Sequence, residues 1–322
     1  MGQQLFRAFA VALLLGLSLL SPARAEMTFT ERELANGPLR GTLTLPSQGE
    51  VTAAALVLSG SGPVDRDGNL PHARNDSLKA LARGLAAHGI ATLRVDKRGI
   101  GASASGVTRE DELRFATYVS DAQSWLAILK ALQWPAGHAP PLFLIGHSEG
   151  ALVATLAAQG TSVAGLVLIA GAGEPAGALL ERQLAAAELP QALHAQSHRI
   201  LESLLRQSPV ADVPPELFTL YRPSVQGYLM SWLPLDPAAE LAKVSAPVLV
   251  VQGTTDLQVS PEDADRLTAA RPGARQARIE GMNHVLKLAP PDRGANLATY
   301  AMPDLPLAPG LIPAIVTFMG AP

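Results

Sequence analysis

The chain has 322 residues, which is enough for one large domain or two smaller ones. Apolar residues make up 48% and charged residues 16% of the sequence, and this composition excludes a disordered, collagen-like or coiled-coil chain. The formal net charge is -3 with no long run of either sign, so the sequence gives no reason to expect nucleic acid as a partner.

The chain contains no cysteine. This absence removes disulfides, thiolate nucleophiles, cysteine-based zinc sites and a lipid-modified N-terminal cysteine. Any nucleophile in this protein must therefore be an oxygen or a nitrogen.

The N-terminal segment has the pattern of a secretory signal peptide. Arg7 precedes an apolar run over residues 8–20, and residues 21–25 end in small side chains at Ala23 and Ala25. The run is shorter than the roughly 20 residues that span a bilayer. We therefore expect cleavage after Ala25, no lasting membrane anchor, and a mature protein that is periplasmic or secreted.

Hydrophobic patterning in the rest of the chain predicts strands that alternate with helices. Residues 29–33 and 39–45 form two early strands around Asn36-Gly37, a hairpin signal, and the apolar run at residues 53–58 fits a strand buried on both faces. Strand and helix then alternate, which indicates an α/β fold with a mostly parallel, doubly wound sheet. Further strands are expected at residues 91–95, 142–145, 165–170, 248–252 and 274–280, and helices at residues 78–88, 118–132, 151–159, 262–270 and 311–319.

The pattern changes between about residues 174 and 241, where helical segments rich in alanine and leucine are broken by prolines. We interpret this segment as a helical cap inserted into a single domain that covers residues 26–322. Large side chains in the segment either line a substrate pocket or simply pack the cap onto the domain. They are Phe218, Tyr221, Tyr228, Met230 and Trp232.

The sharpest local signal is Gly146-His147-Ser148-Glu149-Gly150, which lies between a predicted strand and a predicted helix. A nucleophilic serine on such a sharp turn brings the residues two before and two after it together, so both must be as small as glycine. The following helix points its free amides toward a developing oxyanion. The alternative is a tight turn whose serine has no catalytic role. We expect His147 to point away from the serine.

A serine nucleophile needs a base, and the base needs an acid to orient it. Asp256 and His284 each follow a predicted strand, at the same edge of the sheet as Ser148. The order serine, acid, histidine is the one expected for this type of sheet. Asp256 could instead be a turn-forming residue, in which case Glu174 is the substitute acid.

A glycine-rich turn follows the strand at residues 53–58. It places the backbone amide of Ser61 where it could act beside the amide of Glu149 as an oxyanion hole, although a turn without function is the alternative. Residues 65–67, Asp-Arg-Asp, either contact substrate or pair with one another to brace the loop.

The elbow, the stretch Ser-Gly-Ser-Gly-Pro-Val-Asp-Arg-Asp-Gly at residues 59–68 and the stretch Asp-Lys-Arg-Gly-Ile-Gly-Ala-Ser at residues 96–103 together resemble the α/β-hydrolase superfamily. More narrowly, they resemble its exported bacterial serine aminopeptidase and dienelactone-hydrolase-like group. The resemblance covers nearly the whole mature chain. Many relatives have His-Gly where this chain has Ser59-Gly60, which leaves open how the loop is braced.

Carried over residue by residue, the resemblance implies an α/β-hydrolase fold with a cap over the acyl pocket. Ser148 would be the nucleophile, His284 the base and Asp256 the acid, with the amides of Ser61 and Glu149 as the oxyanion hole. We therefore expect a serine hydrolase that cleaves a carboxylic ester or related acyl bond of a small molecule through an acyl-enzyme. No metal or organic cofactor is needed, and the oligomeric state is left open.

Three other functions remain as alternatives. A serine aminopeptidase would need an acid such as Glu149, Glu174 or Glu181 to hold the amine of its substrate. A binding protein could use the same fold without catalysis. A dinucleotide-binding protein is suggested by Gly171 and Gly173, which match part of the G-x-G-x-x-A fingerprint after a predicted strand.

Overall fold

The computed structural model describes residues 29–106, 109–134, 136–186 and 189–320. The predicted signal peptide lies outside these residues. None of the helices in the described ranges is both long and apolar enough to cross a membrane.

The centre of the fold is one eight-stranded sheet with the order β1-β2-β4-β3-β5-β6-β7-β8. The pairs β1–β2 and β2–β4 are antiparallel, and every other pair is parallel. The predicted α/β-hydrolase fold with a mostly parallel sheet is therefore confirmed. The strands are β1 (Phe29–Asn36), β2 (Leu39–Pro46), β3 (Ala53–Leu58), β4 (Ile90–Val95), β5 (Leu142–His147), β6 (Gly165–Ile169), β7 (Val248–Gly253) and β8 (Arg275–Ile279).

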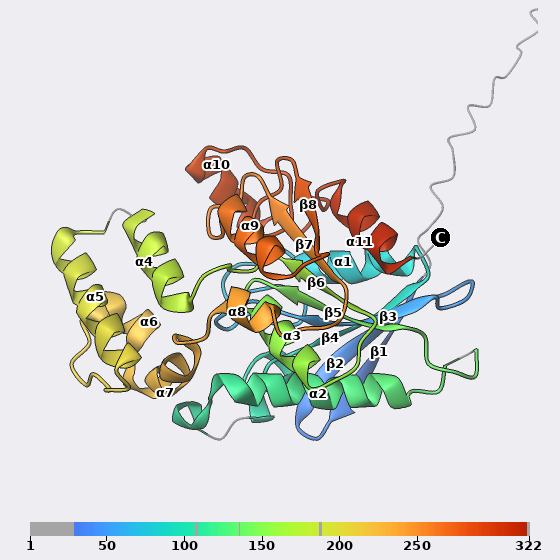
Figure 1. Ribbon diagram of the computed structural model, residues 1–322, viewed down its shortest axis with the longest axis horizontal. Coiled ribbons are helices and arrows are strands. Elements are labelled where there is room, and N and C mark those ends of the chain that lie inside the picture. The colour runs from blue at the N-terminus through green and yellow to red at the C-terminus, as the bar shows by residue number, and fades with distance from the viewer. Residues whose placement is uncertain (1–28, 107–108, 135, 187–188, 321–322) are drawn as a thin grey trace, which may run out of the picture.

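Helices cover both faces of the sheet (Figure 1). Successive side chains of β3 alternate between the two faces, so that Leu56 belongs to one apolar core and Val57 to the other. This explains why the strand is apolar at every position. One face is covered by α2 (Phe115–Ala131), α3 (Glu149–Gln159) and α9 (Pro261–Ala270), and the other by α1 (Ser77–Ala86) and α11 (Leu311–Met319).

Local sequence signals set several element ends. The β1–β2 hairpin turns through Gly37, which has a φ of 57°, between the paired residues Asn36 and Leu39. Helix α9 begins as predicted behind Ser260, whose side chain and that of Asp263 form a reciprocal capping box.

In its described residues, the segment between β6 and β7 contains five α-helices and lies largely to one side of the sheet, with α4, α5 and α6 farthest out in Figure 1. Its last helix, α8, packs on α3 and α9 of the core. The helices are α4 (Ala176–Ala186), α5 (Gln191–Leu205), α6 (Phe218–Tyr221), α7 (Pro223–Trp232) and α8 (Pro237–Leu241). The sequence did not predict α10 (Arg293–Ala298) or the 3₁₀ turns at Gly101–Gly106, Glu110–Glu112, Pro215–Leu217 and Thr299–Ala301.

Candidate active site

Ser148 lies on a sharp turn between β5 and α3. Its φ of 55° and ψ of -121° are strained for a residue other than glycine, at a typical cost of about 1–3 kcal/mol. A Cβ at Gly146 would lie 2.2 Å from the carbonyl oxygen of Gly150, and one at Gly150 would lie 2.4 Å from that of Leu58. Both glycines are therefore required by close backbone packing, as the sequence pattern predicts.

Asp256 and His284 are brought together at the ends of β7 and β8. The Nδ1 of His284 lies 2.9 Å from the Oδ2 of Asp256, and both side chains are buried. The amides of Gln258 and Val259 donate to the other carboxylate oxygen at 2.8 and 3.0 Å. Burial alone would raise the pKa of Asp256, but the His284 partner and the two amides hold it below its ordinary value.

The substitute acid, Glu174, has other partners. Its carboxylate pairs with Arg182 at 2.7 Å and with Arg266 at 3.1 Å. Asp256, not Glu174, is therefore the carboxylate that orients His284 in this structure.

The expectation that His147 points away from the site is wrong. Its Nε2 lies 2.8 Å from the backbone carbonyl of His284, and the two rings lie 4.9 Å apart. Since a carbonyl only accepts, the Nε2–H must donate. Burial, together with the neighbouring His284, lowers the pKa of His147 to about 3, so this ring is neutral and ties the elbow to the loop of the candidate base.

Ser148 and His284 share one edge of the sheet, but no hydrogen bond joins them within the described residues. Contacts of this kind are often long before substrate binds and tighten in the reacting complex. The tie from His147 keeps the backbone of His284 beside the elbow.

The amides of Ser61 and Glu149 border the same cavity as Ser148. In the described part of the chain, neither amide donates to another protein group. Glu149 is the first residue of α3, where helical amides lack partners and the helix dipole is positive. The two predicted donors are therefore unpaired and belong to residues that line the cavity.

The cavity beside Ser148 has a volume of about 60 Å³ and a mostly apolar lining. Of the five large side chains singled out in the helical segment, only Trp232 lines it, and Phe218 is largely exposed instead. One face of α4 also lines the cavity and was not predicted, although its residues have the helical spacing i, i+3, i+4 and i+7. That face consists of Ala176, Leu179, Leu180 and Gln183.

The carboxylate of Glu149 is buried behind its own amide. Burial raises its pKa, while the nearby charge of Lys97 opposes the rise. Tyr228 of α7 lies against the same carboxylate, which together with burial raises the pKa of the tyrosine hydroxyl. Lys97 follows β4, and burial lowers the pKa of its ammonium group while Glu149 opposes the fall.

The Asp-Arg-Asp stretch at residues 65–67 braces its loop. Within the stretch, the amide of Asp67 donates to the carboxylate of Asp65 at 2.9 Å. The ion pairs reach outside it: Arg66 pairs with Glu33 at 2.7 Å and with Asp96 at 3.2 Å, and Asp67 pairs with the buried Arg94 at 3.3 Å. The predicted brace is confirmed, and the predicted mutual pairing holds only for this backbone bond, because the ionic partners lie in or directly after other strands.

Gly171 and Gly173 are explained by packing. A Cβ at Gly171 would lie 2.7 Å from that of Ala151, and one at Gly173 would lie 2.3 Å from the carbonyl oxygen of Asp263. The chain then enters α4 and the other helices of the insertion before it reaches the next strand. The βαβ unit that a dinucleotide fingerprint requires is not formed here.

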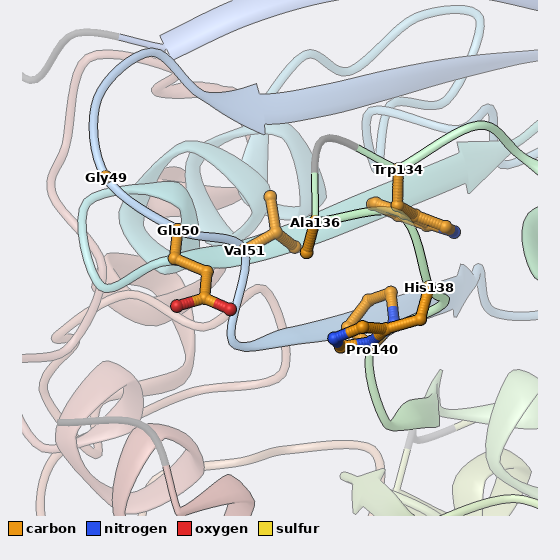
Figure 2. Close-up of a pocket in the computed structure, with 7 residues that line it drawn as sticks. All are labelled: Gly49, Glu50, Val51, Trp134, Ala136, His138 and Pro140. Carbon is orange, nitrogen blue, oxygen red and sulfur yellow. The ribbon is translucent and has the colours of Figure 1, made fainter.

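A second hollow, of about 340 Å³, lies at the opposite edge of the sheet (Figure 2). Its lining comes from the loops that precede β3 and β5, with Glu50 on one loop and Trp134 and His138 on the other. The hollow contains none of the predicted catalytic residues.

The fold and the serine elbow define a hydrolase built on a parallel α/β sheet. Residues 28–298 match the sequence model of the Alpha/beta hydrolase family, and the chain belongs to that family. The narrower likeness to the aminopeptidase and dienelactone-hydrolase group stays a prediction.

The chain resembles curated esterases over part of their length. It is 27% identical to Esterase EstD of Thermotoga maritima over 267 residues, which are 80% of this chain and 60% of EstD. It is 43% identical over 56 residues to Rhodomycin D methylesterase DauP of Streptomyces sp. strain C5, covering 17% of this chain and 19% of that enzyme. The chain thus spans less than two thirds of these relatives.

Solved structures share the fold at low sequence identity. Est1E from Butyrivibrio proteoclasticus, with ferulic acid bound, gives a TM-score of 0.53 at 17% identity and covers 85% of this chain and 96% of its own. A hydrolase from Pseudomonas aeruginosa PA01 gives a TM-score of 0.53 at 20% identity and covers 91% of this chain and 99% of its own. These likenesses show the fold alone.

Proposed function

We propose that this protein is a serine hydrolase that cleaves carboxylic esters through an acyl-enzyme. The observation that carries the proposal is the buried hydrogen bond between Asp256 and His284 at the sheet edge that also bears the strained elbow of Ser148. The similarity to EstD and to the methylesterase supports ester bonds as the target.

In the proposed reaction, the Oγ of Ser148 attacks the ester carbonyl carbon while Nε2 of His284 takes its proton. The negative charge that develops on the carbonyl oxygen is met by the amides of Ser61 and Glu149. The C–O bond to the alcohol then breaks, and His284 gives its proton to the departing oxygen. A water molecule repeats these steps, releases the carboxylic acid and restores Ser148.

Asp256 has a separate part in this scheme. Its carboxylate receives the Nδ1–H of His284, which leaves Nε2 free to accept the serine proton. Because the pKa of Asp256 is held below its ordinary value, the carboxylate stays ionised at neutral pH and stabilises the imidazolium formed during attack.

The acids that an aminopeptidase would need are already engaged. Glu174 is held by two arginines, Glu181 bonds to His198 at the surface, and Glu149 is buried opposite Lys97. None of these three is left as a free anion to hold a substrate amine. The pairing therefore favours an uncharged ester over an aminoacyl substrate.

The cavity suggests the size of the acyl group. Its volume of about 60 Å³ holds only about five water-sized groups. Trp232 forms one wall and stacks on Phe115 with an interplanar angle of 11°, which fixes the wall in place. We therefore propose short acyl chains as the preferred substrates.

Ser148→Ala tests the proposed function. The variant should lose at least about 1,000-fold in kcat on p-nitrophenyl acetate and butyrate, keep its circular dichroism spectrum, and no longer react with a fluorophosphonate probe. Ser162→Ala, an exposed serine after α3, should behave as the parent. Hydrolysis retained by Ser148→Ala would refute the assignment, and aminoacyl p-nitroanilides cleaved faster than the esters would point to the peptidase.

A separate proposal concerns location. The signal-peptide pattern supports export and cleavage after Ala25. A mature N-terminus at Glu26, found by mass spectrometry of the exported fraction, is the expected result. An intact N-terminus on that protein would contradict the proposal.

A further inference from the structure

The loop that carries Ser61 is held by a lysine from a different strand. The Nζ of Lys97, at the end of β4, donates hydrogen bonds to the carbonyl oxygens of Gly60 and Gly62, the latter at 2.7 Å. These two carbonyls flank Ser61 in the chain. The ammonium group lies 5.8 Å from the ring centroid of Tyr118, within the range of a cation–π contact.

The Gly60 carbonyl and the Ser61 amide belong to one peptide unit. Because that unit is planar and trans, fixing the carbonyl on one side fixes the direction of the N–H on the other. A charged donor on the carbonyl also polarises the unit, which makes its N–H a stronger donor. A single hydrogen bond from Lys97 thus sets both the direction of the Ser61 N–H and its strength as a proposed oxyanion donor.

The same lysine interacts by charge with the residue that supplies the second proposed donor. The carboxylate of Glu149 is the charge that favours the ammonium form of Lys97, and Lys97 in turn favours the ionised form of Glu149. The backbone amide of Glu149 is the other group proposed to meet the oxyanion. Lys97 therefore bonds directly to the loop of the first donor and affects the side-chain charge of the residue that carries the second.

Gly60 also packs against the elbow, where a Cβ at Gly60 would lie 3.1 Å from that of Ser148, but this contact leaves its carbonyl to Lys97. The Oγ of Ser59 closes the loop by donating to the carbonyl of Val64 at 3.2 Å, but within the described ranges no other protein group bonds to the Gly60 carbonyl. Gly62 has a φ of 71°, and a Cβ there would meet no neighbour within 4 Å. The loop is open at Gly62, and within the described residues the lysine is what holds the Gly60 carbonyl.

We propose that Lys97 is a positioning residue for the oxyanion hole: it orients the Gly60–Ser61 peptide through its hydrogen bonds to the carbonyls of Gly60 and Gly62. The inference rests on the proposed function. The lysine acts from behind the peptide and does not touch the substrate.

Lys97→Met removes the charge and both hydrogen bonds while keeping most of the side-chain volume. A direct oxyanion donor is worth about 100- to 1,000-fold in kcat, so a residue that acts through one should be worth about 10- to 100-fold. We expect kcat for p-nitrophenyl butyrate to fall by that factor with KM changed less than about threefold. Lys97→Arg, which keeps two donors, should recover part of the loss, and Lys243→Met should match the parent.

Two inhibitors distinguish a misplaced oxyanion hole from a general loss of folded enzyme. The rate of fluorophosphonate labelling and the affinity for an alkylboronic acid, whose serine adduct carries an anionic oxygen, should both fall in proportion to kcat.

Lys97→Met leaves the buried carboxylate of Glu149 without its cation, so the double variant Lys97→Met/Glu149→Gln is measured beside it. Folding is followed by thermal denaturation, and active sites are counted by labelling.

The outcomes distinguish the two proposals. If Ser148→Ala is inactive but Lys97→Met keeps kcat and boronate affinity within threefold of the parent, the role of Lys97 is overturned and the proposed function stands. A loss expressed in KM alone, with boronate affinity unchanged, also overturns it. If Ser148→Ala retains hydrolysis, the proposed function itself fails.

Discussion

Two loops at the same edge of the sheet are held in different ways. The elbow after β5 is fixed by close backbone packing, because a Cβ at Gly146 would meet the carbonyl oxygen of Gly150 and one at Gly150 would meet that of Leu58. The loop after β3 has an open outer side at Gly62 and is anchored by the side chain of Lys97. Steric limits between backbones thus shape the first loop, and a side-chain contact from the end of another strand anchors the second.

This difference decides which changes each loop tolerates. In the elbow, a single methyl group collides with the main chain, so the damage should be structural. At Gly62 in the loop after β3, an added methyl group meets no neighbour within 4 Å, so the damage should be small unless the anchor is lost. Three substitutions test the contrast.

Gly146→Ala should have the largest effect. The added Cβ would lie 2.2 Å from the carbonyl oxygen of Gly150. Because this oxygen and the other nearest atoms all belong to the backbone, the turn must open. We expect a loss of at least about 3 kcal/mol in the free energy of unfolding, measured by urea denaturation, together with loss of esterase activity. Gly49→Ala, with a φ of 80° and no neighbour within 4 Å, is the matched control. Equal losses in the two variants would contradict a closed elbow.

His147→Gln should have an intermediate effect that depends on pH. The pKa of His147 is about 3 in the folded protein and about 6.5 when unfolded, so below pH 6.5 the unfolded chain binds more protons. Its contribution to stability is therefore full above pH 6.5 and lost as the pH falls toward 3. Between pH 7 and 5 the parent should lose about 2 kcal/mol more than the variant. Parallel pH profiles in urea denaturation would show that His147 titrates normally.

Gly62→Ala should have the smallest effect. No atom opposes the new Cβ, so only the positive φ of 71° counts, at about 1 kcal/mol of stability. Because Lys97 bonds to the carbonyls and not to the Cα, kcat should stay within about threefold. A loss of kcat as large as that expected for Lys97→Met would mean that the loop is as sterically limited as the elbow.

The sequence predicted most of the sheet and the elbow because these depend on neighbours in the chain. The apolar run of β3 is buried on both faces, and Gly146 is forced by the turn itself, whereas Gly150 is limited by the neighbouring backbone of β3. The pairing of Asp256 with His284 also followed, since strands that run in parallel deliver their following loops to one edge.

The contacts that were missed join distant parts of the chain through side chains. The position of Lys97 under the Gly60 carbonyl depends on β4 lying next to β3 in the sheet. The direction of His147 depends on where the loop after β8 passes the elbow. Neither leaves a pattern in its own local sequence. The apolar face of α4 did leave one, and was overlooked among the other helices of its segment.

The helical segment between β6 and β7 also separates the proposed catalytic groups in the order of synthesis. Ser148 and both proposed amides belong to the part of the chain made first, whereas Asp256 and His284 follow the whole insertion. Pairing β7 with β6 closes a long loop, which is slow and entropically costly. A nascent chain that ends before β7 lacks Asp256 and His284, so on the proposed function it cannot hydrolyse an ester until the last two strands have docked.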